Sequence, residues 1–273
     1  MKAYRLLVLA IVCVASGPAA AQADDGPAVT ESVISARFPD RSISALVTQL
    51  AEHAPFKRAV LLMPGSPGIM KIESATSFGM KGNFLIRSRR YWLDPETVVL
   101  SVDAPSDQWS SFATVFRAGA RYAEDIRGLR DEIVRRFGNI PLAVVGTSEG
   151  SVSAFYVARA LGPANVKVIF SSSLFLSTPH AAGLASLDFD EIKAPMLWVH
   201  HVDDPCQWTP YSQARRLAER THAPLISVRS SNRGTGNPCE ARSPHGYIGV
   251  ERQTVLAMKE WVVDGVAHDV TGP

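Results

Sequence analysis

The chain has 273 residues, of which 46% are hydrophobic and 20% carry a charge. Its 28 lysines and arginines nearly balance its 26 aspartates and glutamates, which leaves a formal net charge of +2. This balance gives no electrostatic reason to expect a nucleic-acid partner or attachment to a membrane surface. The hydrophobic fraction is ordinary for a soluble globular protein.

The first 23 residues have the parts of a secretory signal peptide. A basic start at residues 1–5 precedes about ten apolar residues, a stretch too short to span a bilayer comfortably. An Ala-x-Ala end at residues 21–23 offers a cleavage site, with a rival at residues 19–21. An uncleaved membrane anchor is the alternative. We expect a signal peptide over residues 1–23, a single domain over residues 24–273, and an exported protein, periplasmic or secreted, without stable membrane insertion after cleavage.

Short apolar runs alternate with helical patterns along the rest of the chain. Runs rich in β-branched residues predict strands at 59–63, 97–102, 141–145, 166–170, 196–200 and 225–228. Amphipathic patterns predict helices at 121–137, 151–161, 210–220 and about 248–263. Segment 32–47 alternates weakly and is compatible with one or two antiparallel strands.

This order predicts an α/β protein with a mostly parallel central sheet and helices on both faces, because its strands are near-continuously apolar. Ligands of such a sheet bind beyond the carboxyl ends of the strands. Only about 25 residues separate the strands that end at Phe170 and begin at Met196. We therefore expect no large lid domain and an open site.

The sequence Gly-Thr-Ser-Glu-Gly at residues 146–150 stands between a predicted strand and a predicted helix. A serine in a sharp turn at that place is a nucleophile elbow. Gly146 and Gly150 must be small, because the turn leaves no room for their Cβ atoms, and the strained turn holds the Ser148 hydroxyl in the open. An ordinary strand–helix turn is the alternative.

A serine nucleophile needs a base, and the base needs an orienting carboxylate. Asp203 and Asp204 directly follow the strand at 196–200. We expect Asp204 to be the acid, because the Asp204-Pro205 turn places its side chain at the rim, with Asp203 as the second choice. His245 is the candidate base, since it lies in a turn between the last strand and the final helix.

The other histidines have less suitable positions. His53, His180, His222 and His268 do not follow a strand end, so surface or packing roles fit them better. His200 and His201 end a strand, where we expect structural roles. A metal site made of these two histidines with Asp203 and Asp204 is an alternative that we disfavour, because no further ligand pair has zinc-like spacing.

Two cysteines, Cys206 and Cys239, remain once the leader is removed. An even number in an exported chain predicts a disulfide, and two free buried thiols are the alternative. Cys206 lies two residues after Asp204, and Cys239 lies six before His245. A bridge would therefore join the two loops that carry the predicted acid and base.

The chain order Ser148, Asp204, His245 is that of the α/β-hydrolases. On these motifs, nearly the whole mature chain resembles an α/β-hydrolase-fold serine hydrolase of the esterase type. The resemblance implies an oxyanion hole made by the backbone N–H groups of Glu149 and Ser66. Ser66 lies in the turn at residues 64–68, where Pro64 replaces a common His-Gly pair and a plain tight turn is the alternative.

The function expected from these residues is that of an exported carboxylesterase acting on a small-molecule ester through an acyl-enzyme intermediate, with no cofactor and no metal. We favour it over a lipase because no lid is expected. Peptide, thioester and polyester substrates stay open, as does a non-catalytic binding protein on the same fold. The oligomeric state is not predicted. We expect the Glu149 side chain and the basic cluster at residues 87–90 to be exposed to solvent.

Overall fold

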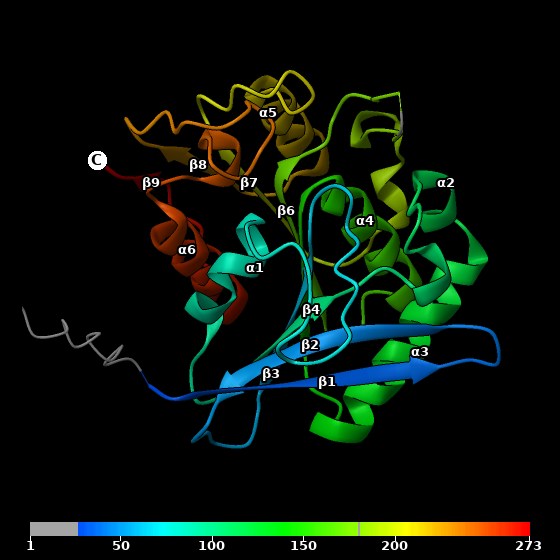
Figure 1. The fold of residues 1–273 in the computed structure, drawn as a ribbon. Helices are drawn as coiled ribbons and strands as arrows, with labels where there is room; N and C mark the ends of the chain where they lie inside the picture. The colour runs from blue at the N-terminus through cyan, green and yellow to red at the C-terminus, as the bar shows by residue number, and fades with distance from the viewer. Residues whose placement is uncertain (1–26, 180) are drawn as a thin grey trace, which may run out of the picture.

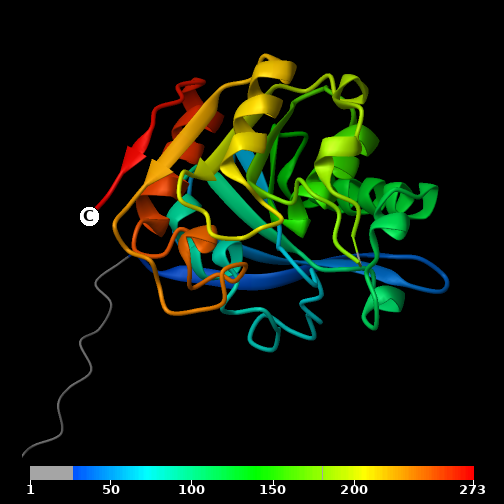
Figure 2. The same cartoon turned by 90° about the horizontal axis from the view of Figure 1, so that it is seen from above.

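The computed structural model describes residues 27–179 and 181–273, so the predicted signal peptide and His180 lie outside the described residues. The described part contains a nine-stranded sheet with the order β1-β2-β4-β3-β5-β6-β7-β8-β9 (Figures 1 and 2). The strands are β1 (Val29–Arg37), β2 (Ser42–Leu50), β3 (Arg58–Met63), β4 (Thr97–Val102), β5 (Leu142–Ser148), β6 (Val166–Ser173), β7 (Met196–His201), β8 (Leu225–Arg229) and β9 (Val270–Thr271).

The sheet is mostly parallel, as predicted. The β1–β2 hairpin is antiparallel and pairs antiparallel with β4, whereas every other strand pairing is parallel. The carboxyl ends of β3, β5, β7 and β8 therefore lie at one edge. In the register of β3 with β5, Met63 stands opposite Gly146, which puts the turn after β3 beside the serine elbow.

Helices cover both faces of the sheet (Figure 1). They are α1 (Phe84–Ser88), α2 (Thr114–Arg117), α3 (Ala120–Phe137), α4 (Glu149–Leu161), α5 (Tyr211–Thr221) and α6 (Glu251–Asp264). Helices α3, α4 and α5 bury apolar side chains in one core, and α1 and α6 bury theirs in a second core on the opposite face. The four long helices match the predicted ones to within three residues at each end.

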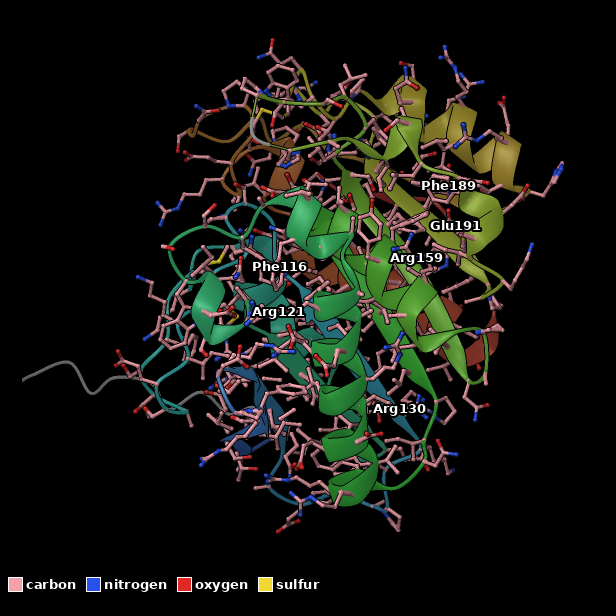
Figure 3. The ribbon with its side chains drawn as sticks, turned by 90° about the vertical axis from the view of Figure 1, so that its right-hand side faces the viewer. Phe116, Arg121, Arg130, Arg159, Phe189 and Glu191 are labelled. Carbon is pink, nitrogen blue, oxygen red and sulfur yellow. A yellow bond between two sulfur atoms is a disulfide. The ribbon has the colours of Figure 1, made fainter. Side chains whose placement is uncertain are left out.

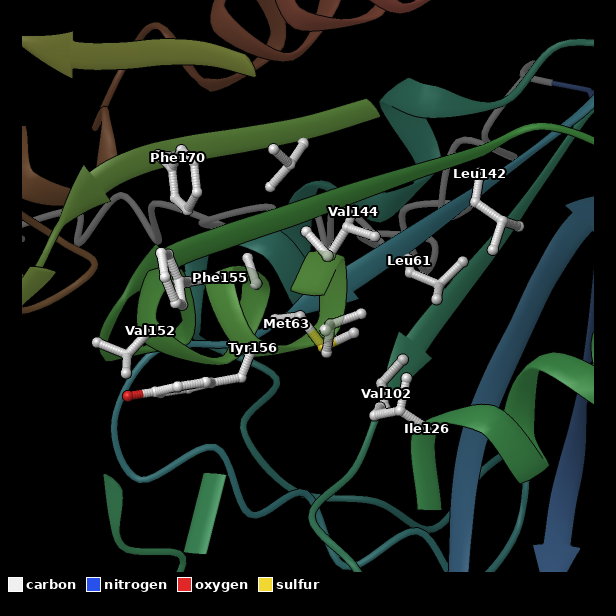
Figure 4. Close-up of a cluster of buried hydrophobic side chains, with 14 of the residues drawn as sticks. Leu61, Met63, Val102, Ile126, Leu142, Val144, Val152, Phe155, Tyr156 and Phe170 are labelled. Carbon is white, nitrogen blue, oxygen red and sulfur yellow. The ribbon is translucent and has the colours of Figure 1, made fainter. Parts of the chain in front are cut away.

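The strands supply both cores because successive side chains point to opposite faces. In β3, Leu61 and Met63 belong to the first core, while Val60 and Leu62 belong to the second. Figure 4 shows the first core, where α4 presents Phe155 to the face of the sheet that carries Leu61. This packing holds α4, the helix that begins at the serine elbow, against the central strands of the sheet.

The connection between β6 and β7 forms no large lid in its described residues. It contains two short 3₁₀ turns, Leu184–Ser186 and Phe189–Glu191. Phe189 packs edge-on against Phe155 and Phe170, and Glu191 pairs with Arg159 of α4 at 2.8 Å (Figure 3). This segment is therefore packed against α4 and the sheet.

No helix among the described residues is long and apolar enough to cross a membrane.

Candidate active site

Ser148 occupies a strained position between β5 and α4. Its φ is 56°, in the left-handed region that residues other than glycine rarely adopt. A Cβ on Gly150 would collide with the carbonyl oxygen of Met63, and a Cβ on Gly146 would collide with that of Gly150. Both glycines are therefore required for the turn, as the sequence predicts.

Asp204 and His245 are brought together although 41 residues separate them. His245 Nδ1 lies 2.9 Å from Asp204 Oδ2, so the carboxylate accepts a hydrogen bond from Nδ1–H. In the neutral ring Nε2 then carries a lone pair. Nε2 is buried, and no described residue forms a hydrogen bond with it. His245 and Ser148 line the same pocket, so the ring that carries this nitrogen lies near the candidate nucleophile.

The Asp204 carboxylate is buried and ionised. Burial alone would raise its pKa, but the hydrogen bonds from His200 and His245 outweigh that effect and hold the pKa well below its ordinary value of 3.8. Thr209 Oγ1 donates to Oδ2 and the Cys206 N–H donates to Oδ1, each at 2.9 Å. These contacts fix the rotamer of Asp204.

Asp203, the alternative acid, points elsewhere. Its side chain is 49% exposed and pairs with Arg233 at 3.0 Å. The structure therefore joins His245 to Asp204 and leaves Asp203 outside the constellation. No cluster of three or more histidine, cysteine, aspartate or glutamate side chains able to hold a metal ion is found in residues 27–179 and 181–273.

Arg87 holds the turn that carries His245. Its Nη2 donates to the carbonyl oxygens of Ala241, at 2.8 Å, and Gly246, at 2.9 Å, and pairs with Glu251 at 2.9 Å. The expectation that Arg87 lies on a solvated face is wrong, because α1 packs between β3 and α6 and turns this side chain toward the loop. Its sequence neighbours gave no sign of this contact.

The Cys206 and Cys239 sulfur atoms lie 2.08 Å apart, the length of a disulfide bond, and their Cα atoms lie 4.5 Å apart. Cys206 also donates its N–H to Asp204, and Cys239 lines the pocket with His245. The bond therefore ties the acid loop to the loop that leads to the base.

The turn after β3 faces the serine elbow. A Cβ on Gly65 would lie only 3.1 Å from Ser148 Cβ, so the backbone approaches the nucleophile closely here. Ser66 lines the pocket that contains Ser148. Glu149 is the first residue of α4, so its N–H has no acceptor within the helix. The two residues whose N–H groups the resemblance implies for an oxyanion hole are thus near Ser148: Glu149 follows it in the chain, and Ser66 lines its pocket.

Arg117 links these two segments. Its side chain is 1% exposed, and Nη2 lies 3.0 Å from Glu149 Oε1 and 3.3 Å from the Pro67 carbonyl oxygen. Nη1 donates to Ser153 Oγ, and the guanidinium stacks over Phe112. The expectation that Glu149 is exposed is wrong: the side chain is 14% exposed because Arg117 draws it inward.

The pocket at the site has a volume of about 430 Å³. Its walls mix apolar side chains, such as Met80 and Phe84, with Asn83 and Arg242. A second cavity of about 760 Å³ lies at the amino end of β7 and is lined by none of Ser148, Asp204 and His245. We place the candidate site in the smaller pocket, because it is lined by the strained Ser148 and by His245, whose Nε2 has no hydrogen-bond partner among the described residues.

No protein-family model and no curated protein sequence matches the chain. Several solved structures are similar in fold. Est1E from Butyrivibrio proteoclasticus has a TM-score of 0.59 at 11% identity, covering 85% of this chain and 98% of that one. A dienelactone hydrolase from Anabaena variabilis has a TM-score of 0.57 at 13% identity, with 86% and 97% covered. An α/β serine hydrolase without a lid from Xanthomonas campestris has a TM-score of 0.54 at 14% identity, with 83% and 94% covered. The chain has the α/β-hydrolase fold.

Proposed function

We propose that the protein is a serine hydrolase that cleaves carboxylic esters, with Ser148 as nucleophile, His245 as base and Asp204 as the orienting acid. One observation carries this proposal: His245 and Ser148 line one pocket, and among the described residues His245 Nε2 is buried without a hydrogen-bond partner while Nδ1 is held by the Asp204 carboxylate. That is the arrangement a general base needs.

The reaction would proceed in two steps. Ser148 Oγ attacks the ester carbonyl carbon while His245 Nε2 takes its proton, and the N–H groups of Glu149 and Ser66 bind the oxyanion. His245 then returns the proton to the departing alcohol, which leaves an acyl-serine. Water, activated by the same nitrogen, attacks the acyl group and regenerates Ser148. Asp204 stabilises the imidazolium in both steps.

Small esters fit the pocket better than long-chain lipids do. A volume of about 430 Å³ is near the lower end for ligand sites, and its walls are part polar. The short connection between β6 and β7 adds no lid in its described residues. Similarity in fold to a solved structure described as a cold-adapted esterase agrees with an ester substrate. The leader sequence and the disulfide support export to an oxidising compartment.

A fluorophosphonate probe, which reacts with activated serines, tests the proposal. We expect the wild type to be labelled and to hydrolyse p-nitrophenyl esters, best with short acyl chains and poorly with an anilide control. Ser148→Ala should abolish labelling and lower kcat by several orders of magnitude. Ser212→Ala, which changes an exposed serine of α5, should keep both activities. A folded wild type that is neither labelled nor active would refute the proposal and favour the non-catalytic binding protein.

A further inference from the structure

Two histidines contact the carboxylate of Asp204. His245 Nδ1 lies 2.9 Å from Oδ2, and His200 Nε2 lies 3.2 Å from the same oxygen. The side chains of His200 and Asp204 are 1% and 0% exposed. The proposed mechanism uses only the first histidine, so the second one needs an explanation.

The tautomer of His200 follows from its other partner. His200 Nε2 lies 2.7 Å from the carbonyl oxygen of Thr209, which can only accept a hydrogen bond. Nε2 therefore carries a hydrogen, which neutral His200 donates to the Thr209 carbonyl oxygen. Asp204 Oδ2, 3.2 Å from the same Nε2, is the second and more distant acceptor that this N–H faces. The ring is held by Phe175, with centroids 5.5 Å apart, and by Tyr211 at 6.2 Å.

His200 is not a second base. It lies at the end of β7 and does not line the pocket that Ser148 and His245 share. Its links toward the reacting atoms run through Asp204 directly and through Thr209, whose carbonyl oxygen accepts from His200 and whose hydroxyl donates to Asp204. A role in the reaction must therefore be exerted through the charge or the orientation of that carboxylate.

We propose that His200 is a positioning residue, which keeps the Asp204 carboxylate ionised and turned toward His245 and so sets the pH range in which His245 acts as a base. This inference rests on the proposed function.

The direction of the effect follows from the hydrogen bonds. Each donor to a carboxylate favours its ionised form and lowers its affinity for a proton. Asp204 and His245 share a hydrogen bond, so a change in the basicity of the Asp204 carboxylate is transmitted to His245. Without the His200 donor the pair would bind a proton more tightly, and His245 would stay protonated to a higher pH.

Other charged groups near His200 do not provide this donor. His201 faces away, with Nε2 3.0 Å from Ser230 Oγ, and burial lowers its pKa. Asp203 and Arg233 pair with each other at the surface. Tyr247 donates its hydroxyl to the Val199 carbonyl oxygen. These groups are the same in the wild type and in variants of His200, so their influence on Asp204 and His245 cancels when the variants are compared with the wild type.

Two substitutions separate the donor from the ring. His200→Phe keeps an aromatic ring of similar volume but removes the N–H, and His200→Gln places an amide N–H close to the position of Nε2. The pH dependence of kcat/KM for a p-nitrophenyl ester reports the titration of His245 in the free enzyme.

We expect the acidic limb of this profile to move up by about one pH unit in His200→Phe, since one hydrogen bond to a charged group is lost. KM should change little, because His200 does not reach the pocket. His200→Gln should stay close to wild type. If the Phe variant does not fold, His200→Leu serves in its place. Leucine also lacks the N–H donor, and it is smaller than phenylalanine.

The inference would be overturned if His200→Phe or His200→Leu folds, reacts with the fluorophosphonate probe and still has the wild-type acidic limb in its pH profile of kcat/KM. An equal shift in the Gln and Phe variants would do so as well, because it would indicate packing instead of donation. These outcomes differ from failure of the proposed function, in which the wild type itself shows neither labelling nor ester hydrolysis.

Discussion

Arg117 is a buried cation at the base of the candidate site. It pairs with Glu149, the residue after the nucleophile, and also donates to the Pro67 carbonyl oxygen in the turn that carries Ser66. The two segments proposed to bind the oxyanion are therefore held by one guanidinium. Its planar set of donors suits this role, which the point charge of a lysine could not fill in the same way.

Replacing Arg117 should destabilise the protein strongly. Arg117→Met leaves Glu149 without its partner in a largely buried position, and the loss of one member of such a pair costs about 3–5 kcal/mol. Urea unfolding measures this free energy. Arg135→Met, which breaks an exposed pair with Glu132, is the matched control and should change stability little. Similar effects of the two substitutions would contradict this account of Arg117.

Sequence patterns point to the three residues of the proposed triad, whereas they do not point to the residues that support them. Ser148 ends β5 and Asp204 comes shortly after β7, and strand ends are visible in the sequence as the limits of apolar runs; His245 lies in the turn before the last helix. Arg87 and Arg117 act through long side chains whose direction depends on the packing of short helices. A charged residue in such a helix resembles a surface residue until its tertiary contacts are known.

The disulfide joins two loops that leave neighbouring strands β7 and β8. The acid loop is short and is fixed by hydrogen bonds of Asp204. The loop after β8 is long, and most of its residues from 231 to 240 are exposed. The bond therefore restrains mainly the segment that leads to His245.

Removing the bond should lower activity more than it impairs folding. In Cys206→Ser/Cys239→Ser the loop before His245 gains freedom, so we expect a lower kcat, together with a stability loss of roughly 3–4 kcal/mol in the chain-entropy model. Steady-state kinetics on soluble, folded protein and thermal unfolding give the two quantities. A well-folded double variant with unchanged kcat would show that the bond is not needed for positioning the base.

The long elements were predictable and the short ones were not. Apolar runs predicted β3 to β8, and amphipathic periods predicted α3 to α6. The structure confirms them with small differences at the ends. Strand β9 has two residues, and α1 and α2 have five and four, too few to show a period. The weak pattern at 32–47 became the β1–β2 hairpin because pairing with β4 buries one of its faces.

For the molecule as a whole, the buried carboxylates determine how stability depends on pH. The pKa of Asp204 lies below 3.8 in the folded protein and returns to that value on unfolding. Its contribution is fully present above about pH 4 and is lost as the pH falls, because the unfolded state then binds more protons. Burial raises the pKa of Asp103 and Asp125, and these two groups act in the opposite sense.

A comparison between variants isolates the contribution of Asp204. Asp204→Asn should be less stable than wild type at neutral pH, yet its free energy of unfolding should fall less steeply between about pH 4 and pH 2. Asp203→Asn, at an exposed position, should keep the wild-type slope. Urea unfolding at a series of pH values tests this. Parallel curves for Asp204→Asn and wild type would contradict the assignment of the low pKa to Asp204.

The cysteine pair also has a consequence for how this sequence can change in evolution. Helix α5 and strand β8 lie within the covalent ring that Cys206 and Cys239 close, whereas Asp204 and His245 lie just outside it, next to its two ends. Residues inside the ring can be inserted, deleted or exchanged while its closure keeps the acid and the base together. Loops of the ring, between α5 and β8 and after β8, are therefore the places where length variation is most easily tolerated.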